Sequence, residues 1–167
     1  MSLNKISRRA RQGVLGYALL EALIAVVITS IGFIGAARLQ TLGMNYSSGA
    51  LFRQKATLLA NQMTDRMRAN SAGLVAGNYN SPNVGDTICL SAGCTPAQLA
   101  VADFTEWIGD VATQLPDGQG LVCVDSTPDD GTPAAPACDA AAGGVLAVKV
   151  WWSDKSGTYR FVTAARP

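Results

Sequence analysis

The chain has 167 residues, of which 49% are hydrophobic and 15% are charged, and its formal net charge at pH 7 is +1. It contains no histidine, no phosphate-binding loop and no G-x-S-x-G motif, so the sequence offers no activated nucleophile or general base. We therefore expect neither an enzyme nor a cofactor. After Asn70 the sequence holds ten acidic and four basic residues, which argues against binding to a nucleic-acid backbone.

The chain begins with a basic leader, residues 1–16, whose charged side chains are all positive: Lys5, Arg8, Arg9 and Arg11. Residues 17–37 are almost entirely apolar, and at about 1.5 Å per residue a helix of this length crosses a hydrocarbon core of about 30 Å. The positive leader predicts a cytoplasmic N-terminus and a periplasmic remainder on the far side of a bacterial inner membrane. An ordinary signal peptide cleaved near Gly35 is the alternative, although such signals have a shorter apolar core and no acid.

Glu21 is the single charged residue of this predicted span. An ionised carboxylate inside a bilayer costs at least about 2.5 kcal/mol unless it is paired, so such a residue is by default functional. The alternative is that Glu21, close to the end of the span, extends toward the lipid headgroups. The sequence therefore predicts either a partner for this carboxylate or a position near the membrane surface.

Gly16, Tyr17 and Glu21 complete a short pattern: a basic leader ending in glycine, an aromatic residue, three apolar residues and a glutamate. This pattern resembles the leader of type IV prepilins and pseudopilins. The resemblance implies that a prepilin peptidase cleaves after Gly16 and N-methylates Tyr17, where phenylalanine is the usual residue. The new amine would lie four residues from Glu21, on the same helix face, where the two charges could neutralise each other within or between subunits.

Beyond the span, good helix formers continue through residues 38–70, and no proline occurs before Pro82. The spacing of apolar residues predicts an amphipathic continuation of the helix, whose stripe packs on the C-terminal part of the chain: Leu39, Leu42, Tyr46, Phe52, Ala56, Leu59, Met63 and Met67. Residues 31–40 and 56–70 are similar to those of PilV-type minor pilins. Major pilins often carry a helix-bending proline after the membrane segment, which this chain lacks.

Residues 71–167 are predicted to form a periplasmic head. Residues 71–87 read as an irregular connector, and Thr95, Pro96 and Gln98 form a capping-box start for a second helix that ends near Pro116. Three strands are predicted from β-prone runs and a hairpin turn: residues 120–125, 145–152 and 158–163. Together they indicate an α+β, type IV pilin-like fold, with a small antiparallel sheet on the long helix, its other face in water and Lys149 on that other face.

All four cysteines follow the span: Cys89, Cys94, Cys123 and Cys138. An oxidising periplasm would favour disulfides, and four cysteines allow three pairings. We favour Cys89 with Cys94 and Cys123 with Cys138, because each pair brackets a loop rich in glycine or proline. A zinc site is the weaker alternative, because the chain lacks histidine and the cysteine spacing is unlike that of known zinc motifs.

These features together indicate the precursor of a minor type IV pilin, which waits in the inner membrane after cleavage and then enters or primes the pilus. The resemblance implies a role in pilus assembly, adhesion and twitching motility, a place at the fibre tip, and as partners the prepilin peptidase, other minor and major pilins and the assembly machinery. A type II secretion pseudopilin shares the same features. A signal-anchored periplasmic binding domain that never polymerises is the alternative of a different class.

Overall fold

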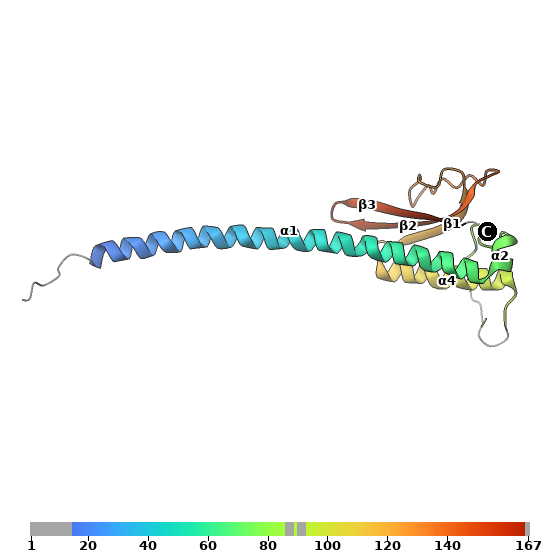
Figure 1. The fold of residues 1–167 in the computed structure, drawn as a ribbon, viewed down its shortest axis with the longest axis horizontal. Coiled ribbons are helices and arrows are strands. Elements are labelled where there is room, and N and C mark those ends of the chain that lie inside the picture. Colours follow the sequence, from blue (N-terminus) through green and yellow to red (C-terminus); the bar gives the residue numbers. More distant parts are fainter. Residues whose placement is uncertain (1–14, 86–88, 90–92, 166–167) are drawn as a thin grey trace, which may run out of the picture. The chain divides into compact units, whose positions relative to one another are not determined.

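The computed structural model describes residues 15–85, 89 and 93–165 (Figure 1). Its longest element is helix α1, Leu15–Ala69, which forms as expected from the absence of proline. The chain divides into two units between Tyr46 and Ser47. We refer to residues 15–46 as the N-terminal helix segment and to residues 47–165 as the head.

The N-terminal helix segment is part of the one described helix that is long and apolar enough to cross a membrane. Its large apolar side chains lie on the surface, as Phe33 and Ile34 do at 72% exposure each. The hydroxyls of Thr29, Ser30 and Thr41 donate to backbone carbonyls four residues earlier. The polar groups of these side chains are therefore satisfied inside the helix, as an apolar surrounding requires.

In the head, α1 buries one stripe of side chains: Ala56, Leu59, Ala60, Met63 and Met67. Phe52 packs against this core as a partly buried residue. The predicted stripe is wrong in its first part, because Leu39, Leu42 and Tyr46 are exposed. A helical apolar period has the same form whether the stripe meets protein or lipid, so the sequence pattern could not distinguish the two.

Residues 71–75, predicted as part of an irregular connector, instead form the short helix α2, Ser71–Val75. Its N-cap is Asn70, whose side chain accepts a hydrogen bond from the backbone of Gly73 at 3.1 Å. Asparagine is among the preferred N-cap residues because its carbonyl oxygen satisfies an otherwise free backbone N–H group. This cap signal is present in the sequence, but Gly73 within the helix and Gly77 just after it obscure the helix.

The second long helix, α4, runs from Pro96 to Gln114, and its predicted capping box is confirmed. Thr95 accepts from the backbone of Gln98, and the Gln98 side chain accepts in return from the backbone of Thr95 at 2.9 Å. The buried face of α4 carries Trp107, whose Nε1 donates to the carbonyl of Leu59 on α1 at 2.8 Å. This bond ties the two helices together in the core of the head.

Three antiparallel strands form one sheet in the order β1–β2–β3: Gln119–Asp125, Val145–Asp154 and Gly157–Ala165. A two-residue turn, Lys155 and Ser156, joins β2 to β3. The structure thus confirms a long helix packed on a small antiparallel sheet, an α+β arrangement (Figure 1). The face toward the helices is entirely apolar at its centre: Val122, Leu146, Val148, Val150 and Trp152.

Close approach between α4 and β1 depends on Gly120. A Cβ atom at this position would lie 2.5 Å from the ring of Trp107 and 3.2 Å from Ile108. Only glycine leaves room for the indole here, which is the ordinary use of a glycine within a strand.

The outer face of the sheet, on the side away from the helices, differs from expectation. It was predicted to meet water, but Ala147, Lys149 and Trp151 on this face are buried. The disulfide loop, which we define as residues 126–144, is held against this face by contacts to Lys149 and to Arg160. The head therefore has three layers, namely the helices, the sheet and the disulfide loop.

Candidate functional site

The predicted cleavage and assembly residues lie at the start of α1. Gly16 and Tyr17 are in its first turn, and Tyr17 is 75% exposed. Tyr17, Leu20, Glu21 and Ile24 line one shallow, open depression along a single helix face. The helix thus brings Tyr17 and Glu21 together, as their four-residue spacing requires.

Glu21 is exposed, and within the described residues no ion pair involves it. Its neighbours on the helix are large and apolar, with Leu20 58% and Ile24 50% exposed. In a bilayer, a carboxylate in such surroundings would need either a cationic partner or a position near the lipid headgroups. This arrangement leaves the carboxylate accessible to a partner from outside the helix.

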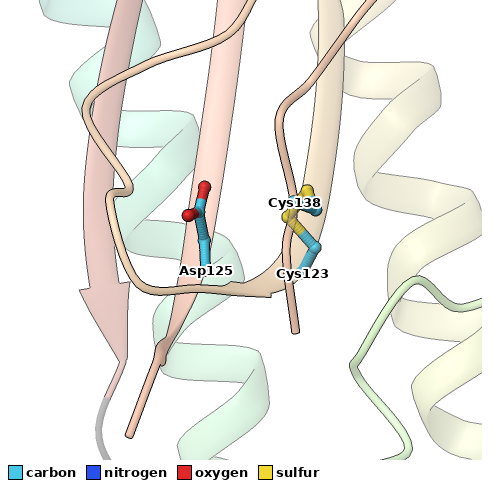
Figure 2. A group of neighbouring side chains, drawn as sticks. All are labelled: Cys123, Asp125 and Cys138. Atoms are coloured by element: carbon cyan, nitrogen blue, oxygen red, sulfur yellow. A yellow bond between two sulfur atoms is a disulfide. The ribbon is translucent and has the colours of Figure 1, made fainter. Parts of the chain in front are cut away.

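The four cysteines form two disulfides in the head, Cys89–Cys94 and Cys123–Cys138. This is the pairing that the loop composition favoured. Cys123, Cys138 and Asp125 lie within 4.8 Å of one another, close enough to hold a metal ion (Figure 2). The two sulfurs are bonded to each other, however, so neither is a free thiolate ligand.

The carboxylate of Asp125 is directed instead to Lys149. Lys149 Nζ lies 2.5 Å from Asp125 Oδ2, and both side chains are fully buried. The same Nζ donates to the carbonyl of Pro136 at 2.8 Å and to the carbonyl of Asp130 at 3.2 Å, and it lies 3.3 Å from Asp130 Oδ1. Because an unpaired buried ion costs several kcal/mol, these contacts explain how a lysine can sit in the centre of a strand.

Asp125 is also held on its other oxygen. Its Oδ1 accepts from the backbone of Thr127 at 2.9 Å, whereas Oδ2 has the ion-pair contact to Lys149 but no well-aligned hydrogen bond. The pair therefore joins the end of β1 to the middle of β2 beneath the disulfide loop. We call Lys149, Asp125 and Asp130 the buried lysine cluster.

The disulfide loop has further fixed points. Arg160 on β3 donates to the carbonyl of Gly131 at 2.6 Å and to the carbonyl of Asp129. At the other end, Asp139 accepts from the hydroxyl and backbone of Ser126, and these hydrogen bonds lower the pKa of the Asp139 carboxyl. The loop is thus attached at both ends and along its length.

A polar network joins the end of α1 to α4. Tyr79, fully buried, donates to Asp103 Oδ2 at 2.5 Å and accepts from Asn70 Nδ2 at 3.1 Å. Burial, followed by the hydrogen bond to Asp103, raises the pKa of the Tyr79 hydroxyl. Arg66 donates to Glu106 at 2.6 Å, a bond that raises the pKa of Arg66 and lowers that of Glu106. The buried hydroxyl of Tyr79 and the amide of Asn70 are both hydrogen-bonded within the head, so we interpret the network as structural.

Sequence reasoning missed Asp125 and Asp130 as partners of Lys149. A signal was present, because a lysine within an apolar strand needs a carboxylate and four aspartates lie in or next to the loop: Asp125, Asp129, Asp130 and Asp139. Which aspartate pairs with Lys149 depends on the path of the disulfide loop, and that path is a tertiary property.

Comparisons with protein-family descriptions, with curated proteins and with solved structures give no match for this chain. The function therefore has to be argued from the arrangement of the residues themselves.

Proposed function

We propose that the chain is the precursor of a minor type IV pilin, similar to the PilV type, which is cleaved between Gly16 and Tyr17 and then enters or primes a pilus. One observation carries this proposal. Glu21 is the sole charge of residues 17–37, and it lies on an exposed apolar helix face four residues from the predicted new terminus. A simple membrane anchor has no use for such a carboxylate.

The chemistry of the proposal is charge neutralisation. Cleavage would create an amine at Tyr17, and N-methylation keeps a protonated amine positive. Pairing with Glu21, within one subunit or between neighbours, removes an isolated charge from an apolar environment. Since a missing partner leaves a buried charge that costs about 3–5 kcal/mol, the pair would fix the register of subunits during assembly.

The head supports the same proposal in two ways. Both of its disulfides are typical of proteins that fold in an oxidising compartment such as the periplasm. Its core is complete without the N-terminal helix segment, so the exposed apolar side chains of that segment are available to lipid before assembly and to other pilin helices afterwards. Other minor and major pilins, the prepilin peptidase and the assembly machinery are the partners we propose.

The first test is the N-terminus of the protein recovered from membranes and from sheared surface fibres. Mass spectrometry of the intact chain and of its N-terminal peptide should find N-methylated Tyr17 in the fibre fraction. A terminus at Met1, or one beyond Ala36, would overturn the proposal in favour of an anchored or secreted domain.

The pseudopilin alternative predicts the same terminus, so it needs a second experiment. Deletion of the gene should abolish surface pili and twitching motility while protein secretion continues. The reverse outcome, loss of secretion with pili intact, would assign the chain to a type II secretion system.

The role of Glu21 is tested by Glu21→Ala, which should still be cleaved but should enter fibres poorly. Leu20→Ala is the matched control, since it removes an exposed apolar side chain beside Glu21 and leaves the charge in place. Normal incorporation of Glu21→Ala would contradict the charge-pairing mechanism without affecting the cleavage result.

A further inference from the structure

The buried lysine cluster places an amine and a carboxyl group in contact inside the head. We propose that Lys149 Nζ and the side-chain carboxyl of Asp125 condense to an isopeptide bond, which covalently links β2 to the end of β1. The observations that carry this inference are the 2.5 Å contact, the complete burial of both side chains and the second carboxylate of Asp130 beside the amine. The inference is independent of the proposed function, because it concerns the head alone.

The first requirement for such a reaction is that water is excluded. Lys149 lies between Leu121 on β1 and Val162 on β3 in the sheet register, so apolar residues flank it on both sides. The disulfide loop covers it, and the Cys123–Cys138 disulfide holds that loop to β1. Hydrolysis of an amide formed here would need water to enter a site that has no exposed surface at either reacting side chain.

The second requirement is orientation. The backbone N–H group of Thr127 donates to Asp125 Oδ1 and so orients the carboxylate. Lys149 Nζ donates to the carbonyl of Pro136 at 2.8 Å, which holds the amine in place. Reacting groups held in contact at fixed orientation behave as if present at very high concentration, which is the usual source of intramolecular rate enhancement.

The reaction consumes no other reagent. A proton passes from the Lys149 ammonium to the Asp125 carboxylate, which gives a neutral amine and a carboxylic acid. The amine lone pair attacks Cγ of Asp125, and the carboxylate of Asp130 moves a proton from the nitrogen to the departing hydroxyl. The C–O bond breaks as the C–N bond forms, and one water molecule leaves.

Burial also favours the product. Two charges in an apolar interior are each poorly solvated, and the condensation removes both. The amide that follows is neutral, and its N–H group can keep the hydrogen bond that Lys149 now donates to Pro136.

The test is the mass of the intact full chain, purified in detergent with its disulfides preserved. We expect a mass lower by one water molecule than that of the chain with two disulfides. After reduction, trypsin should fail to cleave after Lys149, and a second protease that cuts between residues 125 and 149 should release a branched peptide joining them. Cleavage after the exposed Lys155 serves as the internal control.

A succinimide at Asp130 and Gly131 would remove the same mass, so the peptide map decides between them. A linear dehydrated peptide containing residue 130, with normal cleavage after Lys149, would overturn the proposal. So would an intact mass that accounts for the disulfides alone.

Two variants sharpen the result. Lys149→Arg keeps a buried cation, but its guanidinium stays protonated, so no link should form. Asp125→Asn should still link, with loss of ammonia in place of water. If Lys149→Arg fails to fold, the wild-type peptide map remains decisive by itself.

Discussion

The N-terminal helix segment exposes its large apolar side chains, whereas the head buries residues of the same kinds. In the segment, apolar side chains are exposed, as Phe33 is at 72%, and a single carboxylate stands among them. In the head, apolar side chains are buried, as Trp107 is at 0% exposure, and charged groups are buried with them. In the head, the buried Lys149 is paired with Asp125, whereas Glu21 of the segment has no ion-pair partner among the described residues. The segment is therefore the part of the chain that needs an external surrounding.

The largest difference between the two regions should appear when one large apolar side chain is removed from each. Trp107→Ala should lower the free energy of unfolding of the head by about 3–5 kcal/mol, because it leaves a cavity and frees the carbonyl of Leu59. Phe33→Ala should change the same quantity by less than about 0.5 kcal/mol. Denaturant unfolding of the full chain in detergent measures both free energies. Equal losses for the two variants would contradict the conclusion that only the head buries its apolar side chains.

The two disulfides should differ in the same measurement. Replacing Cys123 and Cys138 together by alanine opens a loop with a sequence separation of 15, and should cost about 3 kcal/mol. The matched pair Cys89 and Cys94 closes a separation of only 5 and should cost nearer 2 kcal/mol. If removing Cys89–Cys94 lowered the free energy of unfolding more than removing Cys123–Cys138, loop entropy would not be the main source of the stabilisation.

A smaller effect is expected at the start of α4. Thr95→Ala removes the capping box and should cost about 1 kcal/mol. Thr113→Ala is the control, since its exposed hydroxyl bonds only to carbonyls within the same helix. Thermal unfolding of the two variants should separate them, and an equal shift would contradict the role of the cap.

An effect smaller than that of the cap is expected from the Arg66–Glu106 ion pair, and it should depend on pH. The hydrogen bond from Arg66 lowers the folded-state pKa of Glu106, so the pair stabilises the head above the ordinary value of 4.5 and this contribution is lost as the pH falls through the folded value. Because the Glu106 side chain is 68% exposed, Glu106→Gln should cost less than about 1 kcal/mol at neutral pH. Below the folded pKa the variant and the wild type should have the same stability, and a difference that persisted there would exclude this cause.

Local signals predicted much of the head. The capping box at Thr95 and Gln98, the turn after Asp154 and the helical face of Trp107 each depend on residues a few positions apart, and each is present in the structure. The short reach of these interactions is why a sequence pattern can reveal them.

What the sequence did not predict depends on distant segments. Lys149 was placed on the outer face of the sheet, but its burial follows from the path of the disulfide loop, which no local pattern specifies. Leu39 and Leu42 fit the helical period and are nonetheless exposed, since the period does not say what covers the stripe. The roles of Gly16, Tyr17 and Glu21 remain predictions, because they concern processing and assembly rather than the folded chain.

The contact between Gly120 and Trp107 has a consequence for how this head can vary in evolution. A side chain at position 120 would occupy the space of the indole ring, 2.5 Å from a new Cβ. A larger side chain at position 120 should therefore be accompanied by a smaller one at position 107. A relative with alanine at 120 should carry a residue smaller than tryptophan at 107. In the laboratory, Gly120→Ala should be tolerated better together with Trp107→Phe than alone, and the double-mutant cycle should show coupling of about 0.5–3 kcal/mol.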